Sequence, residues 1–228
     1  MKIKIIATLL LTTLLLTTPL LMSIGSADAN TISNGRYVFT CSKLYSGLCD
    51  ITSTNGQYRM VPIEDYRGGY IDFKRSWTGK LKISSNGMGS SEVALNLTGT
   101  AKPLDDRSFA GRMRLSYYAI PFIPGRISWA KWSLRPATRE EIHAGLLNGL
   151  IAASKALADE RQYSAIWEKR GKEPWSEETL VHYGLLGGRN HGYSHSDVPQ
   201  LLQWYREGIL KVVDNHFELK KGIELTNH

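Results

Sequence analysis

The sequence predicts an α+β protein, in which an antiparallel β-meander, closed as a barrel or folded as a sandwich, precedes a segment of three to four helices. Three observations predict this class. Short alternating apolar segments separated by turn residues fill residues 30–137, and helical periodicity fills residues 138–228. The charge also changes: residues 30–137 carry 15 Lys and Arg against 7 Asp and Glu, and residues 138–228 carry 11 against 13.

The first 29 residues predict a secretory signal peptide. Lys2 and Lys4 precede an apolar run from Ile5 to Leu21, and Ala27-Asp28-Ala29 is a small-x-small cleavage site. We expect cleavage near Ala29 and a secreted or periplasmic protein that begins at Asn30. An uncleaved membrane anchor is the alternative for this run. No later apolar stretch approaches the length of a membrane-spanning helix.

The next 108 residues, 30–137, are expected to form one antiparallel β domain. Segments of five to ten residues alternate between apolar and polar side chains, as strands with one buried face do. The expected strands are Arg36–Cys41, Leu48–Ser53, Gln57–Ile63, Tyr70–Lys74, Thr78–Ser85, Ser91–Thr100, Ser108–Tyr117 and Arg126–Leu134. Asn55-Gly56 predicts a two-residue hairpin turn between the second and third strands.

One apolar stretch, residues 117–125, fits neither periodicity. It contains Pro121 and Pro124, and proline has no amide hydrogen for a central strand. We expect a loop that plugs an end of the barrel, or alternatively one that contacts a membrane surface or a partner.

Residues 138–228 are expected to form the helical domain. Thr138 and Glu141 match a capping box at the start of a helix that ends near Arg161. A second helix should begin near Pro174 or Ser176 and end at Leu186, before two glycines. A third, capped by Ser196 or Asp197, is expected from the apolar stripe Leu201, Leu202, Tyr205, Ile209, Leu210 and Val213.

The chain has two cysteines, Cys41 and Cys49, and in an oxidising compartment such a pair predicts a disulfide across a hairpin or loop.

Basic and aromatic residues mix in the β half. One group comprises Arg67, Tyr70, Lys74, Arg75, Trp77, Lys80 and Lys82. The second group is the predicted ligand-binding set: Arg112, Arg114, Tyr117, Tyr118, Arg126, Trp129, Lys131 and Trp132. Such a face can bind anionic polymers or surfaces through Coulomb attraction and ring stacking. The alternative is that the rings fill the core and the cations only cover a wet face.

The loop of residues 189–197 holds the densest group of reactive side chains. His191 and His195, with His182 and Asp197, are candidate metal ligands, and zinc is the metal that such a set would hold. Ser194, His195 and Asp197 are candidate catalytic residues, because residues 192–196 differ by one residue from a nucleophile elbow. The competing interpretation is a loop that caps neighbouring helices.

We therefore expect an exported, non-enzymatic envelope protein that binds an anionic surface or another envelope protein through its basic β half, without a cofactor. A membrane surface is a further candidate partner, and nucleic acid is not expected. The alternatives are a metal-dependent or serine hydrolase that uses residues 189–197, and an accessory component of a secretion or conjugation system.

Overall fold

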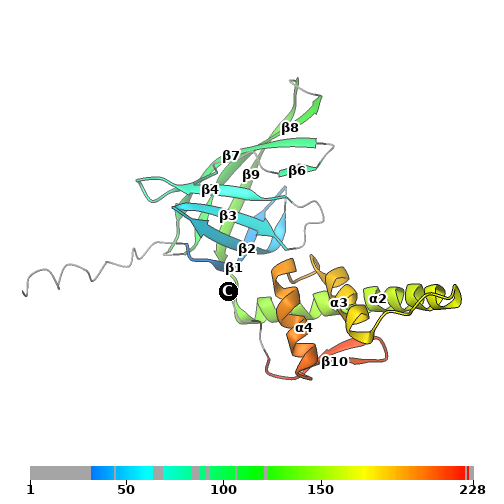
Figure 1. Cartoon of the computed structure of the whole chain (residues 1–228). Helices are drawn as coiled ribbons and strands as arrows, with labels where there is room; N and C mark the ends of the chain where they lie inside the picture. Colours follow the sequence, from blue (N-terminus) through cyan, green and yellow to red (C-terminus); the bar gives the residue numbers. More distant parts are fainter. Residues whose placement is uncertain are drawn as a thin grey trace, which may run out of the picture. The chain divides into compact units, whose positions relative to one another are not determined.

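A closed antiparallel barrel forms the first part of the chain in the computed structural model (Figure 1). The structure describes residues 32–43, 45–63, 69–83, 88–90, 93–105, 107–120, 123–223 and 225; within these, the side chains of residues 88–96, 117–120 and 123–127 are not described. The proposed signal peptide lies outside the described residues. The strands are β1 (Gly35–Cys41), β2 (Ser46–Thr54), β3 (Gln57–Pro62), β4 (Ile71–Arg75), β5 (Leu81–Ile83), β6 (Met88–Ser90), β7 (Val93–Pro103), β8 (Phe109–Ile120) and β9 (Ile123–Pro136).

Eight of these strands make the ring. Strands β1 to β5 pair in sequence, as do β7 to β9, and every pairing is antiparallel. Pairing of β5 with β7 and of β9 with β1 closes the ring, while β6 pairs with β7. The predicted α+β class is confirmed, and the closure selects the barrel over the sandwich.

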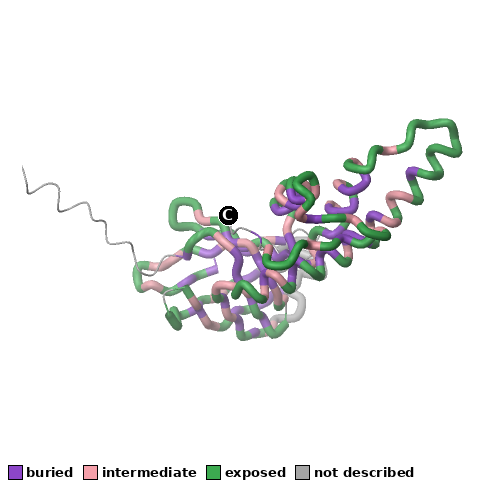
Figure 2. Tube along the Cα trace, turned by 90° about the horizontal axis from the view of Figure 1, so that it is seen from below, coloured by how far each residue is buried: buried purple, intermediate pink, exposed green. Residues whose placement is uncertain are grey.

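The barrel interior is filled with apolar side chains. Along β3 every second residue is buried, which places Tyr58 and Met60 inside. Three aromatic rings meet in the core: the ring centroid of Trp132 is 5.3 Å from that of Phe73 and 6.0 Å from that of Phe39. Figure 2 shows this alternation as buried and exposed positions that follow one another along the strands.

The turn between β2 and β3 is the one that the sequence predicts. Asn55 and Gly56 both have positive φ, 52° and 73°, as a type I′ turn requires. Its twist matches that of the flanking strands, and Thr54 pairs with Gln57 directly across it.

The prediction of a loop at residues 117–125 is wrong. Strand β8 continues to Ile120 and β9 begins at Ile123, so that Tyr118 lies opposite Pro124. Irregular register between Ser116 and Ile120 accommodates the proline. Strand β1 pairs only with residues 132–136 of β9. In the described residues, Pro124 is therefore paired on one side only, with β8, where a missing amide hydrogen is tolerated.

The expected disulfide is not formed in the structure, where Cys41 and Cys49 are free buried thiols. The register explains this. Cys49 lies opposite Tyr37, four residues along β1 from Cys41, which corresponds to roughly 13 Å at the rise of a strand. A disulfide needs Cα atoms within about 7 Å. Cys41 Sγ instead lies 3.9 Å from Met113 Sδ, and Cys49 Sγ donates to the Tyr37 carbonyl at 3.4 Å.

Three α-helices and a short 3-10 helix follow within the described residues: α2 (Arg139–Lys169), α3 (Glu177–Gly188), η1 (His195–Asp197) and α4 (Val198–Arg206). The capping box at Thr138 is present, because its hydroxyl accepts from the Glu141 amide while the Glu141 carboxylate accepts from the Thr138 amide at 2.9 Å. Helix α2 extends eight residues beyond the expected end at Arg161. Ser176 caps α3, which runs two residues past Leu186.

The third helix is shorter in the structure than the sequence predicts. Helix α4 ends at Arg206 and Gly208 follows with φ 70°, which stops the helix. The chain then forms a hairpin of β10 (Leu210–Val213) and β11 (His216–Leu219). Asp214 and Asn215 occupy its two turn positions, with φ 47° and 66°.

The change from strands to helices falls between Pro136 and Arg139. Each part has its own apolar core, and residues 32–228 together make one compact unit. Among the described helices, none is both long enough and apolar enough to cross a membrane.

Candidate functional site

A line of cations crosses the outer surface of the barrel at right angles to its strands. Lys74 on β4 lies opposite Lys82 on β5, and Lys82 lies opposite Thr100 on β7. Thr100 lies opposite Arg112 on β8, which lies opposite Lys131 on β9. All five side chains are exposed. We call these five residues the cation row.

The alternation of the strands fixes this outward direction. On each of the five strands one neighbour of the row is buried in the core: Phe73, Leu81, Ala101, Met113 and Trp132. Because successive side chains of a strand point to opposite faces, the cations between them point to solvent.

Among the described residues, no carboxylate compensates the charge of the row. Like charges directly opposite each other destabilise a sheet. Yet none of its four cations forms an ion pair with another described residue. The carboxylate on the same face of β4, Asp72, is held by Arg59, with 2.8 Å between Nε and Oδ1. An anionic ligand would relieve this repulsion.

A hollow of about 470 Å³ interrupts the surface along the row. It is lined by Lys82, Thr98, Gly99, Thr100, Lys102, Ala110, Gly111, Arg112 and Trp129. A Cβ on Gly111 would lie 2.0 Å from the Thr100 carbonyl oxygen, and one on Gly99 would lie 2.7 Å from that of Arg112. Strands β7 and β8 therefore approach too closely for side chains at these positions, and the hollow lies over this contact.

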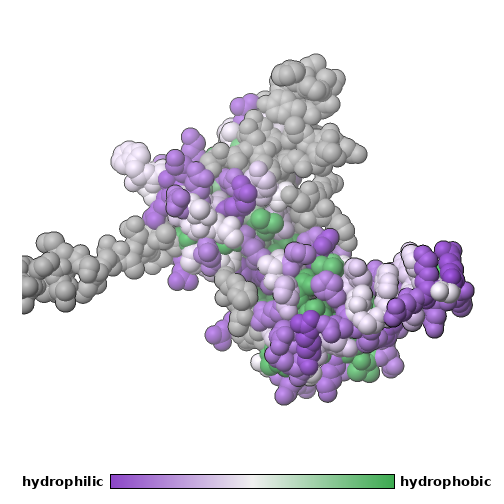
Figure 3. Space-filling view, viewed as in Figure 1, coloured by the Kyte–Doolittle hydropathy of each residue, from purple (hydrophilic) through white to green (hydrophobic). Residues whose placement is uncertain are grey.

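Two exposed tryptophans belong to the barrel. Trp129 is 58% exposed at the hollow and lies opposite Arg114, and Trp77 is 97% exposed in the turn after β4. Each can stack on a sugar ring or insert at a membrane interface. In the view of Figure 3, hydrophilic residues cover most of the described barrel surface.

The structure divides the predicted ligand-binding set. Arg112, Arg114, Trp129 and Lys131 lie exposed on the outer face, as a binding role requires. Trp132 does not belong with them, because it points into the barrel and is 2% exposed. The side chains of Tyr117, Tyr118 and Arg126 lie outside those described.

The reactive residues of the loop 189–197 are held by structural contacts. Asp197 is buried; its carboxylate accepts from the Ser194 amide at 2.7 Å and from Arg36 at 2.8 Å. Ser194 Oγ bonds Asp197 at 3.0 Å and Ser196 Oγ at 2.7 Å. The proposed set of Ser194, His195 and Asp197 would need a histidine base within hydrogen-bond distance of the serine, and the described contacts of Ser194 include none.

The predicted metal ligands are not brought together. In the described part of the chain, no three His, Cys, Asp or Glu side chains gather where they could hold a metal ion. His182 lies on α3, where its ring stands edge-on to Tyr183, and His195 begins η1. His191 lies in the turn that follows α3. Zinc thus stays an expectation from sequence, without a described cluster of ligands.

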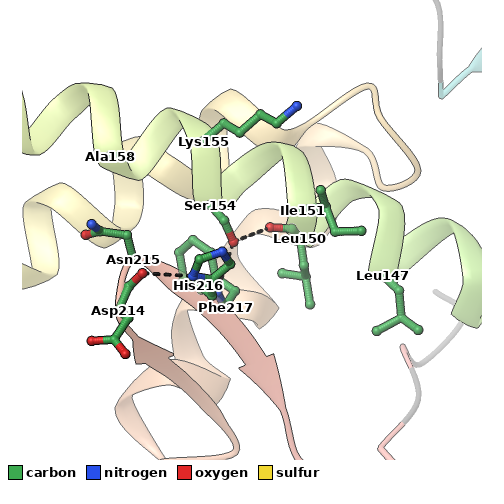
Figure 4. Close-up of a pocket in the computed structure, with 10 residues that line it drawn as sticks. All are labelled: Leu147, Leu150, Ile151, Ser154, Lys155, Ala158, Asp214, Asn215, His216 and Phe217. Carbon is green, nitrogen blue, oxygen red and sulfur yellow. Dashed lines mark hydrogen bonds between the residues drawn. The ribbon is translucent and has the colours of Figure 1, made fainter.

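A second hollow, of about 540 Å³, lies between α2 and the turn of the β10–β11 hairpin (Figure 4). Leu147 and Ile151 line it and are partly exposed. Ser154 also lines this hollow. Its Oγ donates to the Leu150 carbonyl at 2.8 Å and accepts from the Phe217 amide at 3.0 Å. The hydroxyl therefore joins the hairpin to α2 and is not placed as a nucleophile.

In comparisons with known proteins, no family model, no curated protein and no solved structure matches the chain.

Proposed function

We propose that this protein is an exported, non-enzymatic binding protein that holds an anionic surface against the basic outer face of its barrel. The observation that carries the proposal is the cation row, four cations placed in one register line with no carboxylate partner among the described residues.

The proposed site also has features beyond charge. The hollow at Gly99 and Gly111 lets a ligand approach the strand backbone, and Trp129 at its edge offers a flat apolar ring. The positive charge of residues 30–137 extends this attraction over the barrel. Export remains an expectation from residues 1–29, and it selects envelope anions over nucleic acid.

The test is co-sedimentation of the full chain, expressed with its own N-terminal segment, with vesicles. One set contains zwitterionic lipid alone and the other adds an anionic phospholipid. We expect binding only to the anionic set, and weaker binding as salt rises.

The site is tested by the double variant Lys82→Gln, Arg112→Gln. Each cation near an anionic surface contributes about 1 kcal/mol, so the affinity should fall roughly 30-fold. The matched control removes two exposed charges from the other part of the chain, Lys211→Gln with Lys220→Gln. Equal loss in both variants, or binding that salt does not change, would overturn the proposal.

A further inference from the structure

This inference rests on the proposed function and specifies its ligand, because the arrangement of the cation row favours one class of anion over others. We infer that the ligand is a linear, flexible polyanion, a chain with charge on successive units, which lies along the row and across the strands.

The charges are arranged as a line. The outward positions on one side of the row are Lys102, Ala110 and Ser133, and those on the other side are Thr98, Arg114 and Trp129. Across β7 to β9 each flanking line has one cation among three residues, and Lys80, two residues before Lys82, adds a second cation on the side of Lys102. The row itself has four cations among five residues. A narrow line of charge matches a chain better than a broad sheet of headgroups.

The row is long enough to engage several charges of one chain. Neighbouring strands lie about 4.8 Å apart, so the four steps from Lys74 to Lys131 span roughly 19 Å at the Cα atoms. Lys82 and Arg112 stand two steps apart, and Thr100 between them supplies a hydroxyl donor above the hollow.

The row also curves. Strands of an eight-stranded barrel tilt by about 35–45° from its axis, so a line perpendicular to them turns by on the order of 90° over four steps. A flat bilayer that touches Lys82 and Arg112 therefore recedes from Lys74 and Lys131 at the two ends. A flexible chain can bend to reach both ends at once.

The two ends of the row supply the test. Binding of triphosphate and of long-chain inorganic polyphosphate is measured against salt concentration for the full chain and for Lys74→Gln, Lys131→Gln and the control Lys211→Gln. We expect the long chain to bind at least tenfold more tightly than triphosphate, because later contacts are intramolecular. Each end variant should lower the slope of log affinity against log salt by about 0.7, and the control should leave it unchanged.

Anionic vesicles, measured in parallel, separate failure of the inference from failure of the proposed function. The inference is overturned if polyphosphate binds no more tightly than triphosphate, or if the end variants keep the full slope, while vesicles still bind through Lys82 and Arg112. If neither polyphosphate nor anionic vesicles bind, the proposed function fails and the inference fails with it.

Discussion

Arg36 and Asp197 lie 161 residues apart in the chain and form a buried ion pair, with 2.8 Å between Nη2 and Oδ2. Arg36 belongs to β1 and Asp197 ends η1, so the pair ties the barrel to the loop that precedes α4. Asp50 on β2 completes the group, with Oδ1 2.9 Å from Arg36 Nε. Burial by itself lowers the pKa of Arg36, but the two carboxylates outweigh it and raise that pKa.

Loss of Arg36 should be costly. Arg36→Ala leaves Asp197 buried without its cation, and breaking a buried pair in this way costs about 3–5 kcal/mol. Urea unfolding measures the loss. The control is Arg59→Ala. The Arg59 side chain is 52% exposed, and its ion pair with Asp72 stabilises the fold by less than about 1 kcal/mol. If both variants lose the same stability, the Arg36 pair does not join the two parts as described.

The capping box of α2 should make part of the stability depend on pH. Hydrogen bonds from Arg135 and the Thr138 amide lower the pKa of Glu141 from 4.5 to about 2. A lowered pKa means that the charged form stabilises the fold above pH 4.5, and that this contribution disappears as the pH falls from 4.5 toward 2.

Glu141→Gln keeps a hydrogen-bonding side chain but removes this titration. The side chain is a third exposed, so we expect a difference from the parent of about 1 kcal/mol or less at pH 7, shrinking to nothing near pH 2. Unfolding free energies of parent and variant across this range give the comparison. A difference that stays constant with pH would refute the role of the charge.

Cys41 and Cys49 should remain free thiols even after export. Burial raises the pKa of Cys49, which keeps its thiol protonated, and the register separates the two sulfur atoms. A thiol reagent should find none in the native protein and both in denaturant without reductant. Failure to find any thiol in denaturant would mean that the bridge forms and that the β1–β2 register differs.

Gly149 on α2 should not tolerate a methyl group. A Cβ there would lie 2.3 Å from Tyr193 Cδ1, and Tyr193 is fully buried, with its hydroxyl donating to the Leu185 carbonyl at 2.6 Å. We expect Gly149→Ala to cost about 1–3 kcal/mol despite the better helix propensity of alanine. Its neighbour Asn148 is exposed, so Asn148→Ala should be neutral or slightly stabilising in thermal unfolding. Equal melting temperatures for the two variants would contradict this packing.

Local patterns predict the elements of this fold well. All eight ring strands are predicted, since alternation and turns such as Asn55-Gly56 are written in neighbouring residues. Closure by the β5–β7 pairing is a long-range event that no local pattern specifies. The C-terminal hairpin was missed because Ile209, Leu210 and Val213 continue the apolar stripe of α4. Gly208 and the Asp214-Asn215 pair are the signals that predict it.

The sequence predicts which types of residue make up the candidate site, but it does not predict how the strands align them. Arg112, Lys131 and Lys82 stand out in the sequence as basic residues among aromatic ones, whereas their alignment depends on the register of four different pairings. The same ambiguity explains Trp132, which neighbours Lys131 in the chain and faces the opposite side of the sheet. Gly99 and Lys102 were missed, since a glycine or a single lysine in a strand carries no signal of a hollow.

A lysine acetylation footprint would locate the binding face. The full chain is acetylated alone and on anionic vesicles, and the modified lysines are quantified by mass spectrometry. Protection should fall on Lys82 and on its neighbours in and beside the cation row, while Lys211 and Lys220 react as in free protein. Protection of the helical part with Lys82 still fully reactive would place the binding surface elsewhere and contradict the function proposed for the barrel.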